Sequence, residues 1–347
     1  MVPGWLGAGS IDNRRRVISP LFHVEDLRKW YPVKESYLAR STNFVRALDG
    51  VTFDLVEGEI LGLVGESGSG KSTLGRLMVR LEEPTSGKVL FNGRDIFSFS
   101  RSELAEFRRS AQIVFQDPRG SLNPRMRVER ILTEPLVVHG IRSGSGARKR
   151  AAQLLELVGL PPDVMPRYPH EFSGGERQRI AIARALTLGP RFIVADEPFT
   201  ALDVSVQGQI VNLLMELQTE LGLTYVLIAH DLNVVCRVSD RIVVMYLGKI
   251  VEVAPSDRLY DGRMHPYTEV LLSSLPRIEP HDSEDRIIPE GEPGDPSNPP
   301  LGCVFHPRCR YATHMCRKKM PALKEVERGH YVACMLWGDM TSAGEGK

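Results

Sequence analysis

A glycine-rich segment in the first quarter of the chain has the residue types of a phosphate-binding loop. It reads Gly65-Glu66-Ser67-Gly68-Ser69-Gly70-Lys71-Ser72, fits the pattern G-x-x-x-x-G-K-S/T, and follows the apolar run Ile60–Val64. Glycines let successive backbone N–H groups turn toward phosphate oxygens, and the helix expected next adds the positive end of its dipole. Lys71 would reach the β- and γ-phosphates, and the Ser72 hydroxyl would bind Mg²⁺. The alternative is a glycine-rich connection that carries a surface lysine.

A pair of carboxylates follows a second apolar run, Phe192–Ala195. Ligands of open α/β sheets bind at the carboxyl ends of the strands, so Asp196 and Glu197 are expected at such an edge. Asp196 would hold Mg²⁺, directly or through water, and Glu197 would orient and deprotonate an attacking water. Taken alone, Asp196-Glu197-Pro198 also fits the acidic start of a helix.

A second candidate anion-binding turn is Phe172-Ser173-Gly174-Gly175-Glu176, which precedes a helical stretch from Ile180 to Leu188. A serine before two glycines at a helix start presents N–H groups to an anion. One chain has only one triphosphate for its own Lys71 loop. A second turn of this kind therefore indicates a site shared by two subunits, each closing the other's nucleotide. The alternative is an ordinary capped helix start.

Taken together, these segments resemble the ATP-binding subunits of ABC transporters. The resemblance implies that Lys71 and Ser72 belong to the Walker A motif, and Asp196 and Glu197 to the Walker B motif. The family signature is usually Leu-Ser-Gly-Gly-Gln. Here it is the segment Phe172–Glu176, which departs at its first and last residues and keeps the serine and both glycines.

Four further positions gain a role only through this resemblance. It implies that Gln116 is the Q-loop glutamine, which senses Mg²⁺ and water and faces the membrane partner, and that Asp203 lies in the D-loop. It also implies that His230 is the switch histidine beside the γ-phosphate. Without it, Gln116 is a turn residue and His230 a structural histidine at a strand end. Tyr31 would stack on adenine; core packing by Tyr31 or the adjacent Trp30 is the alternative.

The resemblance thus implies catalytic roles for Glu197, His230 and Gln116, with Mg²⁺ bound by Ser72, Gln116 and Asp196. The residues expected to bind ATP are Tyr31, Gly65, Ser67, Gly68, Ser69, Gly70, Lys71, Ser72, Thr73, Ser173, Gly174, Gly175 and Asp203.

These residues need an alternating α/β framework to position them. Between Phe22 and Leu275 short β-type runs alternate with helical patterns, and one helix carries apolar residues on one face. The predicted strands are Ile60–Val64, Ala111–Phe115, Phe192–Ala195, Thr224–Ala229 and Arg241–Tyr246, and the apolar face of the helix is Ile210, Leu213, Leu214 and Leu217. The alternation indicates an α/β fold class. The resemblance implies a P-loop NTPase of the ABC cassette type, with a mixed sheet core, an inserted helical subdomain and a small Cys-rich C-terminal extension.

The length of 347 residues allows two domains of about 150 residues, or one large domain with an appendage. Between Pro276 and Pro300 lie seven prolines among acidic and small residues, which favours an extended linker. The predicted organisation is a leader at 1–20, an ABC ATPase domain at 21–275 with its helical subdomain at about 117–188, a linker at 276–300 and an extension at 301–347.

The composition excludes some functions. Hydrophobic residues make up 42% and charged residues 25% of the chain, which is ordinary for a protein with a buried core. The net charge of +1 argues against a protein that coats nucleic acid by bulk positive charge. No run of roughly 18 apolar residues is present, so no segment is predicted to cross a membrane. Arg14–Arg16 look like the start of an export signal, but Pro20 and His23 interrupt the apolar run after them, and we expect a cytoplasmic protein.

Eight short motifs sharpen the resemblance to the ATPase subunits of oligopeptide/dipeptide importers. They are Tyr31-Pro32-Val33-Lys34, Ala47-Leu48-Asp49-Gly50, Gly65-Glu66-Ser67, Gln116-Asp117-Pro118, Ser121-Leu122-Asn123-Pro124-Arg125-Met126, His265-Pro266-Tyr267-Thr268, Gly302-Cys303 and His306-Pro307-Arg308-Cys309. The resemblance implies a motor that couples ATP binding and hydrolysis at a subunit interface to the uptake of di- and oligopeptides. Related importers of nickel complexes or oligosaccharides carry very similar ATPases.

The same resemblance implies the partners. The segment inserted between Pro32 and Phe44 is more like the second of two different ATPase subunits, so a paralogous second ATPase and a heterodimer are expected. We also expect two transmembrane permease subunits and an extracytoplasmic substrate-binding protein as partners. The chain is expected to lie peripherally on the cytoplasmic face of the inner membrane and to bind no nucleic acid. A soluble ABC ATPase acting on ribosomes or DNA, or a redox-sensing regulatory subunit with idle hydrolysis, fits the motifs less well.

Four of the five cysteines lie near the C-terminus. Cys303, Cys309, Cys316 and Cys334 are separated by five, six and seventeen residues. Four thiolates in a short segment of a cytoplasmic protein bind Zn²⁺ or an iron–sulfur cluster more readily than they form disulfides. The resemblance implies a 4Fe-4S cluster with all four as ligands; Zn²⁺ and unligated thiols are the alternatives. A segment this short is also expected to need a metal, because it makes little apolar core of its own.

Overall fold

The computed structural model describes residues 19–33, 43–200, 202–259, 264–274, 287–292 and 294–335. The chain forms two compact units. One contains residues 1–56, 61–97 and 230–347, and the other contains 57–60 and 98–229. Most of the predicted leader, the insertion after Pro32 and the first part of the predicted linker lie outside the described residues. The predicted domain limits stay predictions.

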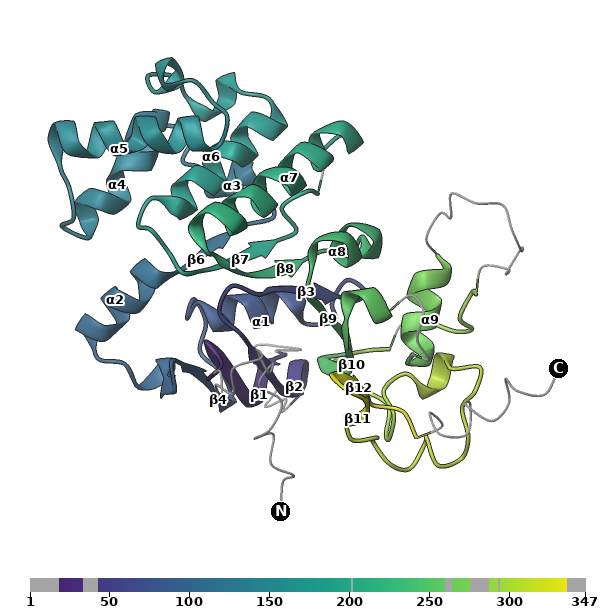
Figure 1. The fold of residues 1–347 in the computed structure, drawn as a ribbon. Coiled ribbons are helices and arrows are strands. Elements are labelled where there is room, and N and C mark those ends of the chain that lie inside the picture. The colour runs from purple at the N-terminus through teal and green to yellow at the C-terminus, as the bar shows by residue number, and fades with distance from the viewer. Residues whose placement is uncertain are drawn as a thin grey trace. The chain divides into compact units, whose positions relative to one another are not determined.

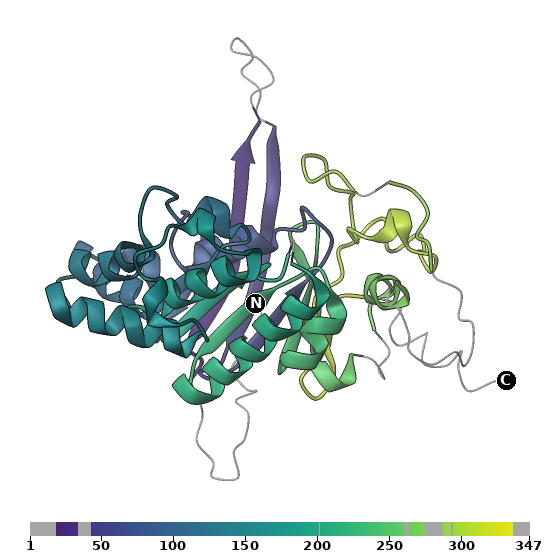
Figure 2. The same cartoon turned by 90° about the horizontal axis from the view of Figure 1, so that it is seen from above.

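The first unit begins with an antiparallel sheet in the order β2-β1-β4-β5. Its strands are β1 (Phe22–Pro32), β2 (Phe44–Leu55), β4 (Ser86–Phe91) and β5 (Arg94–Asp95). Side chains alternate across β1, so that Phe22 and Val24 are fully buried. The pairing shifts between Val24 and Leu27, where Asp26 has a positive φ of 43°. Figure 2 shows β1 and β2 as a long purple ribbon.

The first unit also contains a mixed sheet. Strand β3 (Ile60–Val64) pairs in parallel with β9 (Arg241–Tyr246), and β9 pairs antiparallel with β10 (Lys249–Pro255). Two short strands continue the sheet, β12 (His330–Val332) beside β10 and β11 (Lys324–Glu327) beside β12. The helices of the unit are α1 (Lys71–Met78), α8 (Leu232–Val238) and α9 (Pro266–Ser273). At Gly62 a Cβ atom would lie 2.2 Å from Val235 Cγ1, so this glycine lets α8 pack close on β3.

The second unit is a parallel three-stranded arrangement with helices. Its strands are β6 (Ala111–Val114), β7 (Phe192–Asp196) and β8 (Thr224–Ile228), and β7 pairs with both neighbours. Every residue of β7 and β8 is buried, as is usual when helices cover both faces of a parallel sheet. The helices are α2 (Arg101–Ser110), α3 (Pro118–Ser121), α4 (Val128–Val138), α5 (Gly144–Leu157), α6 (Gly174–Leu186) and α7 (Val204–Leu221). Helices α4, α5 and α6 pack on one another (Figure 1).

The predicted α/β class is confirmed. All five predicted strands are present within one or two residues of their expected ends, and the predicted apolar face of α7 is buried. The antiparallel strands β1, β2 and β4 were not among the predicted strands. Within the part of the chain that the structure describes, no helix combines the length and the apolar character that crossing a membrane requires.

Candidate active site

The glycine-rich loop joins β3 to α1 and has the backbone geometry that its sequence predicts. Gly65, Gly68 and Gly70 all have positive φ values, of 150°, 79° and 103°. A Cβ atom would lie 2.2 Å from the carbonyl oxygen of Met245 at Gly65, and 2.2 Å from that of Ala47 at Gly70. Both positions therefore require glycine for two reasons, a backbone conformation that other residues rarely adopt and the lack of room for a side chain.

Lys71 is the first residue of α1, and its side chain lies within the loop. The residue is 5% exposed, and Nζ donates hydrogen bonds to the carbonyl oxygens of Gly65 at 2.7 Å and Glu66 at 2.9 Å. The N-cap residue of α1 is Gly70, which provides no side-chain cap. The loop thus places an ammonium group and an uncapped helix start at one point, an arrangement suited to an anion.

Tyr31 lies beside the first turn of α1, where the Thr73 side chain is close enough to its hydroxyl to lower the pKa of Tyr31 slightly against the opposing effects. The hydroxyl also donates to Glu82, and burial and this carboxylate raise the pKa of Tyr31. The Nζ of Lys29 lies 5.0 Å from the centre of the Tyr31 ring. The neighbouring Trp30 contacts Phe44 and Arg46 instead. Tyr31 therefore lies next to α1, the helix that follows the glycine-rich loop.

The second unit carries the two predicted carboxylates, Asp196 and Glu197. Asp196 ends β7 and is 3% exposed, and Glu197 follows it. Glu197 has a φ of 45°, which is uncommon for a residue with a side chain and is typical of strained positions at functional sites. Its Oε2 accepts hydrogen bonds from Gln116 Nε2 at 2.8 Å and from Thr200 Oγ1 at 2.9 Å. The structure thus brings together two of the three predicted catalytic residues, Gln116 and Glu197.

The predicted signature segment begins α6 as a capped helix. Ser173 is the N-cap: the Glu176 backbone N–H donates to its Oγ at 3.3 Å, while Ser173 N–H donates to Glu176 Oε2 at 2.8 Å. Hydrogen bonds from Ser173 lower the pKa of Glu176. A Cβ atom on Gly175 would lie 2.5 Å from Val206 Cγ1, which explains one of the two glycines by packing against α7. The capped start is therefore present, and binding of a partner's phosphate stays a prediction.

Two further predicted residues lie at element ends. Asp203 is the N-cap residue of α7; it is exposed, and its side chain makes no capping hydrogen bond. His230 directly follows β8 and is also exposed. Both are accessible at their ends of helix and strand, as their predicted contacts with a nucleotide or a second subunit would require.

The residues predicted to bind Mg²⁺ fit that ion chemically. They offer the Ser72 hydroxyl, the Asp196 carboxylate and the Gln116 amide, and Mg²⁺ prefers oxygen ligands of this kind.

The predicted iron–sulfur cluster is wrong. No group of three or more His, Cys, Asp or Glu side chains is arranged to hold a metal ion in the described part of the chain, which includes all four C-terminal cysteines. The same finding gives the zinc alternative no support. Burial raises the pKa of both Cys303 and Cys309 to about 11.

The physical reason for this error lies in the packing of the C-terminal segment. Val304 and Phe305 are 2% and 1% exposed, and the Phe305 ring lies 5.3 Å from the rings of both Tyr246 and Tyr267. The backbone N–H of Cys303 also donates to the carbonyl oxygen of Cys316 at 2.8 Å. The segment therefore shares an apolar core with β9 and α9, contrary to the expectation that it needs a metal.

Two residues with a place beside the loop were missed by the sequence analysis. Arg308 donates to the carboxylate of Glu66, and the Tyr267 hydroxyl accepts from the Glu66 backbone N–H. Arg308 and Tyr267 occur in motifs that supported the family resemblance, but nothing in those motifs assigns them a contact. They are 242 and 201 residues from Glu66 in sequence, so no local pattern could have indicated the contact.

Comparison with known proteins defines the class. Residues 48–200 match the ABC transporter family, and residues 251–316 match the C-terminal region of oligopeptide/dipeptide transporters. A solved dimeric structure of the ATP-binding cassette MJ0796, in a post-hydrolysis state with ADP and Pi, has a TM-score of 0.60 and 33% identity. The match covers 68% of this chain and 98% of that one. The structure of cbiO1 from Clostridium perfringens also has a TM-score of 0.60, with 29% identity over 70% of this chain and 91% of that one. The fold and the site define an ATP-binding cassette ATPase.

The curated relatives define the family within that class. The oligopeptide transport ATP-binding protein AppF of Bacillus subtilis is 49% identical over 320 residues, which cover 91% of this chain and 97% of the relative. The dipeptide transport ATP-binding protein DppF of Haemophilus influenzae is 48% identical over 316 residues, 91% of this chain and 96% of the relative. The chain belongs to the ATP-binding proteins of oligopeptide and dipeptide ABC transporters.

Proposed function

We propose that the chain is the ATP-hydrolysing motor of an importer of di- and oligopeptides. The observation that carries this proposal is the glycine-rich loop with Lys71 inside it, in a chain whose C-terminal region matches peptide transporters. That second match favours an importer over a soluble ATPase that acts on ribosomes or DNA. The cargo itself contacts other subunits, so the same motor would also serve nickel complexes or oligosaccharides.

The division of roles follows from the chemistry of the residues. The loop N–H groups and Lys71 bind the phosphates of ATP, and Ser72, Asp196 and Gln116 hold Mg²⁺. When bound, Mg²⁺ supplies positive charge that offsets the charge of the phosphates. Glu197 is the general base: its carboxylate accepts the proton of the attacking water, and the hydrogen bonds from Gln116 and Thr200 orient it. His230 contacts the γ-phosphate, and Tyr31 stacks on adenine.

The partners extend this proposal. A second ATPase subunit completes the nucleotide site, because the capped turn at Ser173 is a second candidate anion-binding turn in a chain that has one Lys71 loop, and both Ser173 and Asp203 are exposed. The related cassette MJ0796 is described as a dimer, which supports such a pairing. We infer a heterodimer with a paralogous subunit. It lies on the cytoplasmic face of the membrane, where two permease subunits and an extracytoplasmic binding protein supply the transport path.

Peptide uptake in the native cell tests this function. A strain that carries Glu197→Gln in place of the wild-type chain should lose the uptake of a labelled tripeptide, because the variant binds ATP without turnover. Uptake of the free labelled amino acid is the control and should not change. Unchanged tripeptide uptake would contradict the proposed cargo.

Affinity purification of the chain from membranes tests the motor role. It should recover two hydrophobic subunits, and recovery of ribosomal proteins instead would contradict that role.

A further inference from the structure

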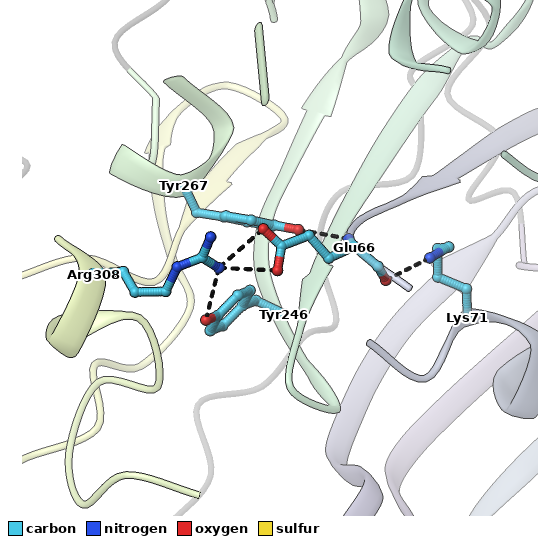
Figure 3. Close-up of polar contacts among 5 residues, drawn as sticks. All are labelled: Glu66, Lys71, Tyr246, Tyr267 and Arg308. Carbon is cyan, nitrogen blue, oxygen red and sulfur yellow. Dashed lines mark hydrogen bonds and ion pairs between the residues drawn. The ribbon is translucent and has the colours of Figure 1, made fainter. Parts of the chain in front are cut away.

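The C-terminal segment reaches the glycine-rich loop through one arginine. Arg308 lies in a short 3-10 helix (His306–Arg308), and its Nη1 is 3.0 Å from both carboxylate oxygens of Glu66, the second residue of the loop. The same Nη1 lies 3.3 Å from the Tyr246 hydroxyl. The Arg308 side chain is only 9% exposed, and that of Glu66 is 31% exposed (Figure 3). This ion pair is therefore largely shielded from water.

A second contact holds the backbone of the same loop residue. The Tyr267 hydroxyl of α9 accepts a hydrogen bond from the Glu66 backbone N–H at 2.6 Å. Tyr267 is fully buried, and burial raises its pKa, so the phenol stays protonated. On the other side of the same residue, the Glu66 carbonyl oxygen accepts a hydrogen bond from Lys71 Nζ at 2.9 Å (Figure 3). Side chain, N–H and carbonyl of Glu66 are thus all held.

The charge of Glu66 makes this arrangement more than packing. A carboxylate in a loop that binds phosphates repels its ligand, unless a cation offsets it at short range. Arg308 is that cation. The buried Nε of Arg308 has no hydrogen-bond partner within the described residues, and the contacts to Glu66 and Tyr246 are made through Nη1.

We propose that Arg308 is a positioning residue for ATP. It holds the Glu66 carboxylate away from the phosphates and offsets its charge, which makes the C-terminal segment part of the nucleotide site. The inference rests on the ATP site proposed above and adds a residue to it. It also gives the C-terminal segment a role that needs no metal.

Equilibrium binding of a non-hydrolysable ATP analogue with Mg²⁺ to the purified full chain tests the inference. Arg308→Met should raise the Kd about tenfold, because the loop then carries an uncompensated negative charge near the phosphates. Arg308→Lys keeps the charge and should stay within about threefold of wild type. The matched control is Arg310→Met, since Arg310 pairs with Glu269 of α9 and not with the loop; its Kd should not change.

A double-mutant cycle separates charge from structure. Glu66→Gln removes the repelling charge, so its Kd should equal that of wild type or be lower. The double variant, Glu66→Gln with Arg308→Met, should have a Kd within about twofold of that of Glu66→Gln. A merely structural role predicts instead that the double variant stays as weak as Arg308→Met. That result would overturn the inference, as would an unchanged Kd for Arg308→Met.

If Arg308→Met does not fold, as judged by circular dichroism, Glu66→Gln still tests the inference: a Kd raised by tenfold or more would overturn it.

Two outcomes keep the inference separate from the proposed function. A wild-type chain that fails to bind the analogue would overturn the ATP site itself. A wild type that binds, with Arg308→Met equal to it, would overturn the inference alone.

Discussion

The glycine-rich loop and the cluster of side chains around Glu197 are built in different ways. The loop is a backbone structure: its glycines adopt conformations that few residues accept, and Lys71 is almost fully buried within it. The cluster around Glu197 depends on side chains, and one of these, Gln116, is exposed. The geometry of a site made by backbone groups is fixed by the fold. A site made by side chains can be altered by a substitution that leaves the fold unchanged. ATP binding and ATP turnover should therefore respond to different substitutions.

The largest effect is expected at Glu197. Replacing it with Gln keeps the shape and an oxygen that accepts hydrogen bonds from Gln116 and Thr200, but removes the carboxylate that we propose takes the proton of the attacking water. The kcat for ATP should fall by about a thousandfold, within the range that general-base catalysis contributes, while the Kd for ATP changes little. Phosphate release under saturating ATP measures this. Glu216→Gln, an exposed carboxylate on α7 of the same unit, is the matched control.

A smaller effect, on binding rather than turnover, is expected in the loop. Lys71→Ala removes a buried ammonium group that is placed for phosphate, so the Kd for ATP should rise by about a hundredfold. Titration calorimetry at fixed Mg²⁺ measures the change. If Lys71→Ala kept wild-type affinity while Glu197→Gln lost it, the contrast between the two regions would be reversed and the account would fail.

The smallest effect is expected at Glu176, where this chain departs from the usual signature. Gln at this position keeps an acceptor for the Ser173 N–H but loses the negative charge at the start of α6. The free energy of unfolding should fall by less than about 1 kcal/mol. Thermal denaturation measures it, and a loss of several kcal/mol would show that the capping box stabilises far more than a helix end.

The sequence predicted the loop well because its requirements are local. Phosphate binding by backbone N–H groups needs glycines and a lysine at fixed spacing, and Gly65, Gly70 and Lys71 adopt the geometry that this spacing implies. The sequence did not predict the hydrogen bond between Gln116 and Glu197. The catalytic roles that the family resemblance implied for these two residues agree with that hydrogen bond.

Other features depend on contacts between distant parts of the chain. The pairing of β1 with β4 and the ion pair of Arg308 with Glu66 join segments whose spacing carries no signal. The cysteines show the opposite error, since closeness in sequence suggested a metal site. What decides such a site is the geometry of the side chains, and Phe305 stabilises the segment through apolar contacts instead.

In the proposed function the glycine-rich loop binds ATP, and Glu197 is the general base for its hydrolysis. Both roles are tested by the nucleotide recovered from Glu197→Gln after incubation with Mg²⁺ and radiolabelled ATP, followed by rapid removal of free nucleotide. We predict that the bound nucleotide is almost entirely intact ATP, whereas the wild-type chain under the same conditions retains ADP. Bound ADP on Glu197→Gln, formed at the wild-type rate, would contradict the account.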